Sequence, residues 1–273
     1  MIIILFWATN IYPSKPNPTM LPEERKREIV QIVEKQGGAS VHELAEGLSV
    51  SESTIRRDLK EMDGEDLIRR SHGGALPVKN LADEASFARR SVQNLEAKKA
   101  IADRALNEIS EGQVFFFDSG TTVLEVAKRV PKDGSIISVT NSIELGFELG
   151  KEDGDLKVTG GNQRNKSRSL VGPVAGRFLS NHQFDLLFLG TNSIDLQNGL
   201  STPNEQEGYI KNLMVEKSER VILLADGSKL NQQSYVKFAD IGDLDMFITD
   251  IRLTEPQREK FQKKDVNTVD ALL

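Results

Sequence analysis

The stretch from Ser40 to Met62, SVHELAEGLSVSESTIRRDLKEM, decides how the first part of the chain folds. Ser40 and Ser51 each precede a short run of residues with helical periodicity, and serine is a preferred N-cap residue. Two short helices joined by a tight turn at Ser49-Val50 predict a helix-turn-helix, whose second helix enters the DNA major groove. Six apolar residues would pack these helices together: Leu44, Ala45, Leu48, Val50, Ile55 and Leu59.

The segments on either side extend this motif. Residues 22–36 carry apolar side chains at helical spacing and end at two glycines, which predicts a preceding helix. The stretch 66–78, DLIRRSHGGALPV, alternates apolar and basic residues into a second pair of glycines, which predicts a short hairpin. We therefore predict a winged helix-turn-helix domain over residues 20–78.

Polar side chains on the predicted second helix and on the hairpin are candidates to contact DNA. Arginine binds guanine bidentately or clamps phosphates, and serine and threonine do either less strongly. The alternative for the basic residues is an ordinary solvated helix face, and the alternative for the histidine is a hydrogen-bonded turn. The candidates are Ser51, Ser53, Thr54, Arg56, Arg57, Lys60, Arg69, Arg70, His72 and Gly73.

The charge of the chain does not by itself favour a nucleic-acid partner. The formal net charge is −6, and residues 20–78 contain nine Lys and Arg against twelve Asp and Glu. DNA affinity must therefore come from a few clustered basic side chains and from dimerisation, and it should fall steeply with salt. We expect a homodimer or homotetramer, because two-fold symmetry matches palindromic half-sites.

Composition and length favour a cytoplasmic protein of two domains. A chain of 273 residues is long enough for two cores, and the absence of cysteine excludes disulfides and cysteine nucleophiles. The three histidines are far apart in the sequence, so we predict no metal site and no cofactor. The opening run MIIILFWA is too short to span a bilayer. We expect residues 1–19 to be a disordered tail or to precede the true start at Met20.

The remainder of the chain has a different periodicity. Residues 79–111 include a predicted linker helix from about Ser91 to Ser110. From residue 112 to residue 273, apolar strands alternate with helices and end in turn residues, which indicates a mostly parallel α/β sheet. The fold class is therefore α/β, with an N-terminal winged helix-turn-helix followed by a mostly parallel α/β domain.

The segment VFFFDSGTT runs from an apolar strand into a small-residue loop before a helix. Free N–H groups and the helix dipole favour an anion at such a loop, and a phosphate is the natural guest. A plain N-cap is the alternative. The candidate residues are Asp118, Ser119, Gly120, Thr121 and Thr122.

Other predicted strands also end in polar or glycine residues. In open α/β sheets, ligands bind outside the carboxyl ends of the strands, so these residues are candidates for the same site. Each is more often an ordinary loop residue than a ligand contact, and their common position is what supports the set. The set comprises Thr140 and Asn141, Gly160 and Gly161, the segment 190–192, and Asp226 with Lys229.

The chain resembles the DeoR family of transcription regulators from Met20 to about Asp250. VSESTIRRDL and LIRRSHGGA look like the family's helix-turn-helix and wing, and DSGTT, VTNS, VTGG, LGTNSID and LADGSK look like its effector domain. The resemblance implies an effector domain similar in fold to ribose-phosphate isomerases. It also implies a phosphate on the DSGTT loop, with Asn141, Gly161, Asp226 and Lys229 near the sugar.

The function that follows from the resemblance is a DNA-binding repressor of a sugar or polyol catabolic operon, relieved by a phosphorylated sugar metabolite. Fructose, glycerol, deoxyribonucleoside and sugar-alcohol pathways all remain open. One alternative is a sugar-phosphate isomerase-like enzyme, with Asp118, Glu207, Asp226 and Lys229 as possible acids and bases. A fused DNA reader has no use in an isomerase, so we predict no enzyme activity. A helix-turn-helix used only for protein interaction is the second alternative.

Overall fold

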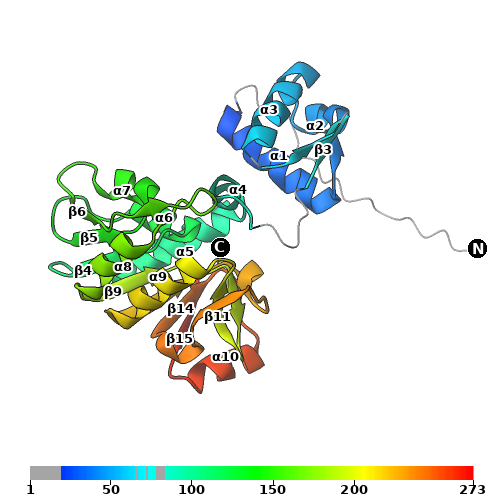
Figure 1. Cartoon of the computed structure of the whole chain (residues 1–273). Helices are drawn as coiled ribbons and strands as arrows, with labels where there is room; N and C mark the ends of the chain where they lie inside the picture. Colours follow the sequence, from blue (N-terminus) through cyan, green and yellow to red (C-terminus); the bar gives the residue numbers. More distant parts are fainter. Residues whose placement is uncertain (1–19, 66, 72, 78–83, 273) are drawn as a thin grey trace, which may run out of the picture. The chain divides into compact units, whose positions relative to one another are not determined.

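The computed structural model describes residues 20–65, 67–71, 73–77 and 84–272 (Figure 1). The predicted tail, residues 1–19, lies outside this range, and so does His72. The chain divides into two compact units, Met1–Gln93 and Asn94–Leu273. We call them the N-terminal unit and the C-terminal unit.

The N-terminal unit is a winged helix-turn-helix, as predicted. A small antiparallel sheet in the order β1-β3-β2 completes the wing. The elements are α1 (Pro22–Gln36), β1 (Ala39–Ser40), α2 (Val41–Gly47), α3 (Glu52–Gly64), β2 (Arg69–Arg70), β3 (Gly74–Leu76) and α4 (Phe87–Val92).

Serine caps and a left-handed turn shape the helix-turn-helix. Ser40 forms a capping box with Glu43 at the start of α2, and the Ser51 hydroxyl accepts from the Thr54 N–H at the start of α3. Ser49 has a φ of 54°, which turns the chain sharply between the two helices. The apolar faces of α1, α2 and α3 meet in one core that includes Ile29, Val33, Leu44, Ile55, Leu59 and Met62.

The C-terminal unit is built on a parallel sheet of seven strands in the order β15-β14-β12-β9-β4-β5-β6. Buried apolar side chains fill most of these strands, which is typical of a sheet covered on both faces. The strands are β4 (Val114–Phe117), β5 (Ile137–Thr140), β6 (Asp155–Val158), β9 (Phe184–Leu189), β12 (Ser218–Leu224), β14 (Met246–Thr249) and β15 (Asn267–Asp270).

Helices follow most of the strands, and short elements extend the loops. The helices are α5 (Leu95–Ala105), α6 (Thr121–Ala127), α7 (Ile143–Leu149), α8 (Pro173–Ser180), α9 (Glu205–Glu216) and α10 (Glu255–Gln262), with 3-10 turns η1 (Leu106–Glu108), η2 (Gly227–Lys229) and η3 (Ile241–Asp243). A hairpin joins β7 (Asn162–Gln163) and β8 (Leu170–Val171), and a second antiparallel sheet contains β10 (Ser193–Asp195), β11 (Gly199–Thr202) and β13 (Val236–Ala239).

The order of the strands reverses at the centre of the large sheet. The chain runs from β4 outward to β5 and β6, then returns to β9 beside β4 and continues through β12 and β14 to β15. Right-handed crossovers therefore place α6 and α7 on one face of the sheet and α8 and α9 on the other. In open α/β sheets, ligands bind at the carboxyl ends of the strands beside such a reversal.

The stretch predicted as one helix from Ser91 to Ser110 is instead split between two helices and a 3-10 turn. α4 ends at Val92, and Asn94 adopts a left-handed conformation, with a φ of 49°, before α5 begins at Leu95. Val92 packs with the core of the N-terminal unit, whereas α5 belongs to the C-terminal unit. Helical periodicity on both sides of Asn94 predicts one continuous helix. The break needs no glycine or proline to mark it in the sequence, because asparagine is one of the few other residues that adopt the left-handed conformation readily.

In the part of the chain that the structure describes, no helix is both long enough and apolar enough to cross a membrane.

Candidate DNA-binding surface and ligand site

The outer face of α3 carries a cluster of polar and basic side chains. Ser53, Arg56, Arg57 and Lys60 are exposed, and their spacing places them along one side of the helix. We call this surface the α3 cation face. Thr54 is half-buried beside it. Among the described residues, no ion pair involves Arg57 or Lys60.

Asp58 and Glu61 of α3, and Glu65 directly after it, bind α1. The Arg25 guanidinium makes two hydrogen bonds to the Asp58 carboxylate, at 2.6 and 3.3 Å, and both side chains are buried. Lys26 Nζ lies 2.9 Å from Glu61 and 3.3 Å from Glu65. These contacts hold three carboxylates against two cations of α1, instead of leaving them on the α3 cation face. An N-terminal unit that is acidic overall thus presents a basic surface.

The start of α3 is held by its own side chains. The Ser51 hydroxyl is within 2.8 Å of the Ser53 hydroxyl and 2.9 Å of the Thr54 hydroxyl. Arg56 donates to Glu52 at 2.9 Å, one helical turn away, and this hydrogen bond lowers the pKa of the exposed Glu52 carboxyl. Ser51 is therefore a structural cap as well as a DNA candidate, and Arg56 is partly neutralised before any DNA arrives.

The wing carries two more exposed arginines. Arg69 and Arg70 form β2 and pair with β3, and the Arg70 N–H donates to the Asp63 carboxylate at the end of α3. Gly73 is exposed in the turn. Gly74 lies so close to β1 that an added Cβ would be 2.1 Å from the Ala39 carbonyl oxygen. His72, the remaining wing candidate, falls outside the described residues.

The carboxyl ends of β4 and β9 meet at the reversal of the sheet. Asp118, directly after β4, is fully buried. Its Oδ2 accepts from the Gly190 N–H at 2.9 Å and from Lys211 Nζ at 2.5 Å, and Lys211 also donates to the Gly190 carbonyl at 2.9 Å. The two loops also touch, because a Cβ on Gly120 would lie 3.4 Å from Gly190 Cα.

The loop from Asp118 to Thr122, which we call the 118–122 loop, leads into α6. The Ser119 N–H donates to Asp118 Oδ1 at 2.8 Å and to Asn141 Oδ1, from the end of β5, at 3.1 Å. Ser119, Thr121 and Thr122 are almost fully buried, and no side chain caps the N-terminus of α6. The backbone N–H groups at this end therefore lack the side-chain acceptor that Ser51 supplies to α3.

A second acidic side chain lies beside this centre. Glu207, one turn before Lys211 on α9, accepts from Ser169 at 2.9 Å, from Thr202 at 3.1 Å and from Arg164 at 3.3 Å. Burial would raise its pKa, but the hydrogen bonds and the charges of Lys211 and Arg164 outweigh burial and lower it.

Gly161 lies at the carboxyl end of β6, at the base of the β7–β8 hairpin. Its φ is 116°, and an added Cβ would be 2.6 Å from the Val171 carbonyl oxygen. A glycine is therefore required here for the close packing of the hairpin. The close contact of Gly161 is therefore with Val171 of β8, within the same chain.

Asp226 and Lys229 lie at the carboxyl end of β12. Asp226 is buried and accepts from the Asn94 amide at 3.0 Å and from the Ser228 hydroxyl at 2.5 Å. Burial would raise the pKa of Asp226, but the charge of Lys229 and the hydrogen bonds of Ser228 outweigh burial and lower it. Thr249, at the end of the neighbouring β14, is buried, and its hydroxyl has no hydrogen-bond partner within the described chain.

The structure thus joins some of the predicted ligand residues directly and leaves others apart. Asp118, Ser119 and Asn141 share one hydrogen-bond network, while Asp226 and Lys229 form a second cluster at the same edge of the sheet. Lys211 belongs to the first network and Glu207 lies beside it. Neither was predicted to bind the ligand, although Glu207 was named as a possible acid or base of the enzyme alternative. A signal existed, since Lys211 sits between Ile210 and Met214 on the buried side of a helix, where a lysine needs a partner.

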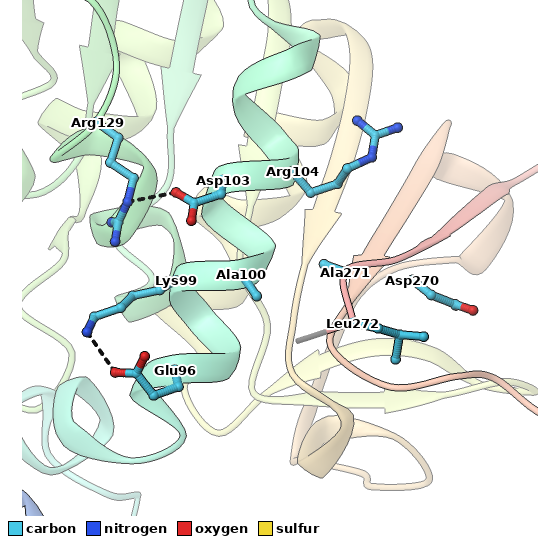
Figure 2. Close-up of a pocket in the computed structure, with 9 residues that line it drawn as sticks. All are labelled: Glu96, Lys99, Ala100, Asp103, Arg104, Arg129, Asp270, Ala271 and Leu272. Carbon is cyan, nitrogen blue, oxygen red and sulfur yellow. Dashed lines mark hydrogen bonds and ion pairs between the residues drawn. The ribbon is translucent and has the colours of Figure 1, made fainter.

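A cavity of about 520 Å³ lies on the outer side of α5 (Figure 2). Its charged residues largely pair with one another: Lys99 binds Glu96 at 2.7 Å and Arg129 binds Asp103 at 2.9 Å (Figure 2). None of the predicted ligand residues lines it. We therefore treat it as a solvated groove separate from the ligand site.

Comparison with known proteins defines the class. Residues 25–80 match the family model of the DeoR-like helix-turn-helix domain, and residues 93–251 match that of the DeoR C-terminal sensor domain. The chain therefore belongs to the DeoR family. It is a DNA-binding transcription regulator with a C-terminal sensor domain.

Two sequence relatives agree with this class. The chain is 52% identical over 253 residues to the HTH-type transcriptional regulator GlpR of Haloferax volcanii, covering 93% of this chain and 99% of the relative. It is 32% identical over 232 residues to the glycerol-3-phosphate regulon repressor of Escherichia coli, covering 85% and 92%. Among solved structures, it is similar to ribose 5-phosphate isomerase A of Methanocaldococcus jannaschii, with a TM-score of 0.38 and 14% identity over 50% of this chain and 55% of that chain.

Proposed function

We propose that this chain is a cytoplasmic repressor that binds operator DNA through the α3 cation face and the wing, and that a phosphorylated sugar or polyol releases it. The separation of charge across α3 carries the DNA part of the proposal. Three acidic side chains bind Arg25 and Lys26 of α1, while Arg57 and Lys60 face solvent. Exposed cations of this kind clamp phosphates and read guanine in the major groove.

The ligand site that we propose is the 118–122 loop at the reversal of the sheet. The phosphate group accepts from the backbone N–H groups at the start of α6 and from the hydroxyls of Ser119, Thr121 and Thr122. The sugar or polyol extends toward Asn141 on one side, and toward Asp226 and Lys229 on the other. The name of the Escherichia coli relative makes glycerol 3-phosphate the first compound to test.

We further propose that Asn94 couples ligand binding to the N-terminal unit. It is the first residue of the C-terminal unit, and its side-chain amide donates a hydrogen bond to Asp226 in the proposed ligand site. A ligand that moves Asp226 alters the hydrogen bond between Asp226 and Asn94. It therefore alters the backbone conformation at Asn94, where the C-terminal unit begins. Operator binding then responds because the ligand binds the two states with different affinity. The repressor works as a homodimer or homotetramer on a two-fold operator.

The DNA proposal is tested by the double variant Arg56→Ala/Arg57→Ala on an operator selected from a random-sequence library by the wild-type protein. We expect operator binding to be lost while ligand binding is unchanged. The matched control is Lys35→Ala, which removes an exposed charge at the end of α1, away from the α3 cation face. The proposal fails if the double variant binds the operator as tightly as the control does.

The ligand proposal is tested by a thermal-shift screen of the full chain. The compounds are glycerol 3-phosphate, fructose phosphates, deoxyribose phosphates and sugar-alcohol phosphates, each beside its unphosphorylated form. A ligand at 100 times its Kd stabilises the folded state by about 2.7 kcal/mol, which is readily measured as a higher Tm. A shift with one phosphorylated compound supports the site. No shift with any of them contradicts it.

A further inference from the structure

The outer edge of β6 is an open strand edge at one end of the large sheet. β6 is the last strand in the sheet order, and among the described residues no other strand pairs with its outer side. Figure 1 shows β6 beside α7 at this end of the C-terminal unit. An unpaired edge is a template for another strand, and proteins that do not use it usually protect it.

Apolar side chains border this edge. Phe147, on α7, is 74% exposed, and Ile143, one helical turn before it, is 39% exposed. Val158 of β6 is 40% exposed and packs against Gly146, the neighbour of Phe147 in the sequence. The exposed strand edge and the exposed apolar face of α7 are therefore continuous, and we call them together the β6 edge surface. Contiguous apolar surface beside an open edge marks an interaction site.

The backbone of β6 sets which residues can pair outward. The Thr159 N–H donates to the Thr140 carbonyl, toward β5. Because backbone groups alternate along a strand, Asp155 and Lys157 also turn their N–H and C=O groups toward β5, and Leu156 turns its groups outward. An antiparallel partner centred on Leu156 would exchange both hydrogen bonds with it.

The charged side chains of β6 are complementary to those of β6 in a second copy of this chain, so we take a second copy as that partner. If two copies pair antiparallel about Leu156, Asp155 of each copy faces Lys157 of the other, and two opposite-charge pairs form. A shift of one residue, which centres the pair on Lys157, would place two lysines face to face. In the single chain these two side chains are half-exposed and bind each other at 3.2 Å, so both are available on the same face of β6.

We infer that the β6 edge surface is the two-fold contact between C-terminal units of this protein, with β6 pairing antiparallel to β6 of a second copy about Leu156. The two sheets then continue into one. The two α7 helices lie on the same face of that sheet, and each buries Phe147 of the other copy at the axis. The inference deepens the proposed homodimeric repressor, since it names the surface that joins two DNA-binding units.

Two charge reversals test the contact directly. Asp155→Lys gives a chain with two lysines on the edge, and Lys157→Asp gives a chain with two aspartates. Each variant alone opposes like charges across the two-fold axis, and we expect its association to be at least about tenfold weaker than that of the wild type. Mixed in equal amounts, the two variants present only opposite charges to each other, so association returns as a heterodimer.

The measurement is sedimentation equilibrium of the full chain without DNA or ligand. Wild-type protein at twice the mass of each single variant, with the mass restored in the mixture, supports the inference. Phe147→Ser, which changes no charge, should also weaken association. The inference is overturned by a monomeric wild type, by single variants that keep the wild-type mass, or by a mixture that does not recover it. These readouts are independent of operator and ligand affinity, so they separate failure of this contact from failure of the proposed function.

Discussion

Lys211 Nζ lies 2.5 Å from Asp118 Oδ2 and donates at the same time to the Gly190 carbonyl oxygen. One ammonium group from α9 thus joins the ends of β4 and β9, the two strands between which the sheet reverses. The pair is almost fully buried, so the attraction between the two charges has to offset the cost of removing each from water. The proposed ligand loop begins at this pair.

Loss of one partner should therefore destabilise the C-terminal unit strongly. Lys211→Met leaves the Asp118 carboxylate buried without its counter-ion, and we expect the free energy of unfolding to fall by about 3–5 kcal/mol. The double variant Asp118→Asn/Lys211→Met removes both charges and should recover part of this loss. Urea unfolding measures each value. Lys237→Met, which breaks an exposed pair with Asp240, is the control and should cost under about 1 kcal/mol. Equal losses in the two lysine variants would contradict this account.

The wing provides a second test, in two adjacent glycines. A methyl group on Gly74 would lie 2.1 Å from the Ala39 carbonyl oxygen, whereas one on Gly73 would meet nothing within 4 Å. We expect Gly74→Ala to separate β3 from β1, to destabilise the N-terminal unit by about 1–3 kcal/mol, and to weaken operator binding. Gly73→Ala should leave stability unchanged. Thermal unfolding and operator titration of both variants check this, and similar behaviour of the two would show that the wing is packed differently.

The junction residue Asn94 should transmit the ligand signal. Asn94→Gly keeps the left-handed backbone, which glycine adopts without strain, but removes the amide that donates to Asp226. We expect the variant to bind the phosphorylated ligand and the operator, while the ligand changes operator affinity much less than in the wild type. Operator titrations with and without ligand measure this. Full ligand response in Asn94→Gly would remove Asn94 from the mechanism.

Glu207 predicts a specific pH dependence. Its pKa is lowered from the ordinary value of 4.5, so its ionised form stabilises the folded state above that pH, and the stabilisation is lost as the pH falls through the lowered pKa. Glu207→Gln should be less stable than the wild type at pH 7 by about 1–3 kcal/mol, and the difference should shrink below pH 4.5. Chemical unfolding across this range checks the sign. A stability difference between the wild type and Glu207→Gln that grows as the pH falls would contradict this prediction. The exposed Glu219→Gln is the control.

The local features of this molecule follow from local sequence patterns. Serine caps, glycine stops and apolar periodicity predicted the helix-turn-helix, and alternating strands and helices predicted the parallel sheet. The 118–122 loop was recognisable because a strand, a small-residue loop and a helix follow one another directly. Whether a phosphate binds there stays a prediction.

Contacts between distant residues were not predictable in the same way. Arg25 and Asp58 are 33 residues apart, and Asp118 and Lys211 are 93 residues apart. Their pairing depends on how α1 packs on α3 and on the order of the strands, neither of which a single sequence states. The acidic balance of residues 20–78 did not reveal the α3 cation face, because a net charge does not say on which surface each charged side chain lies.

The central claim is that a phosphorylated metabolite controls operator binding by this chain. The most direct test is fluorescence anisotropy of the selected operator, titrated with wild-type protein in the presence and absence of saturating phosphorylated ligand from the thermal-shift screen, with its unphosphorylated form as control. We predict that the phosphorylated compound weakens operator binding by about tenfold or more and that the control does not. Operator affinity that is the same with and without saturating ligand would contradict the account.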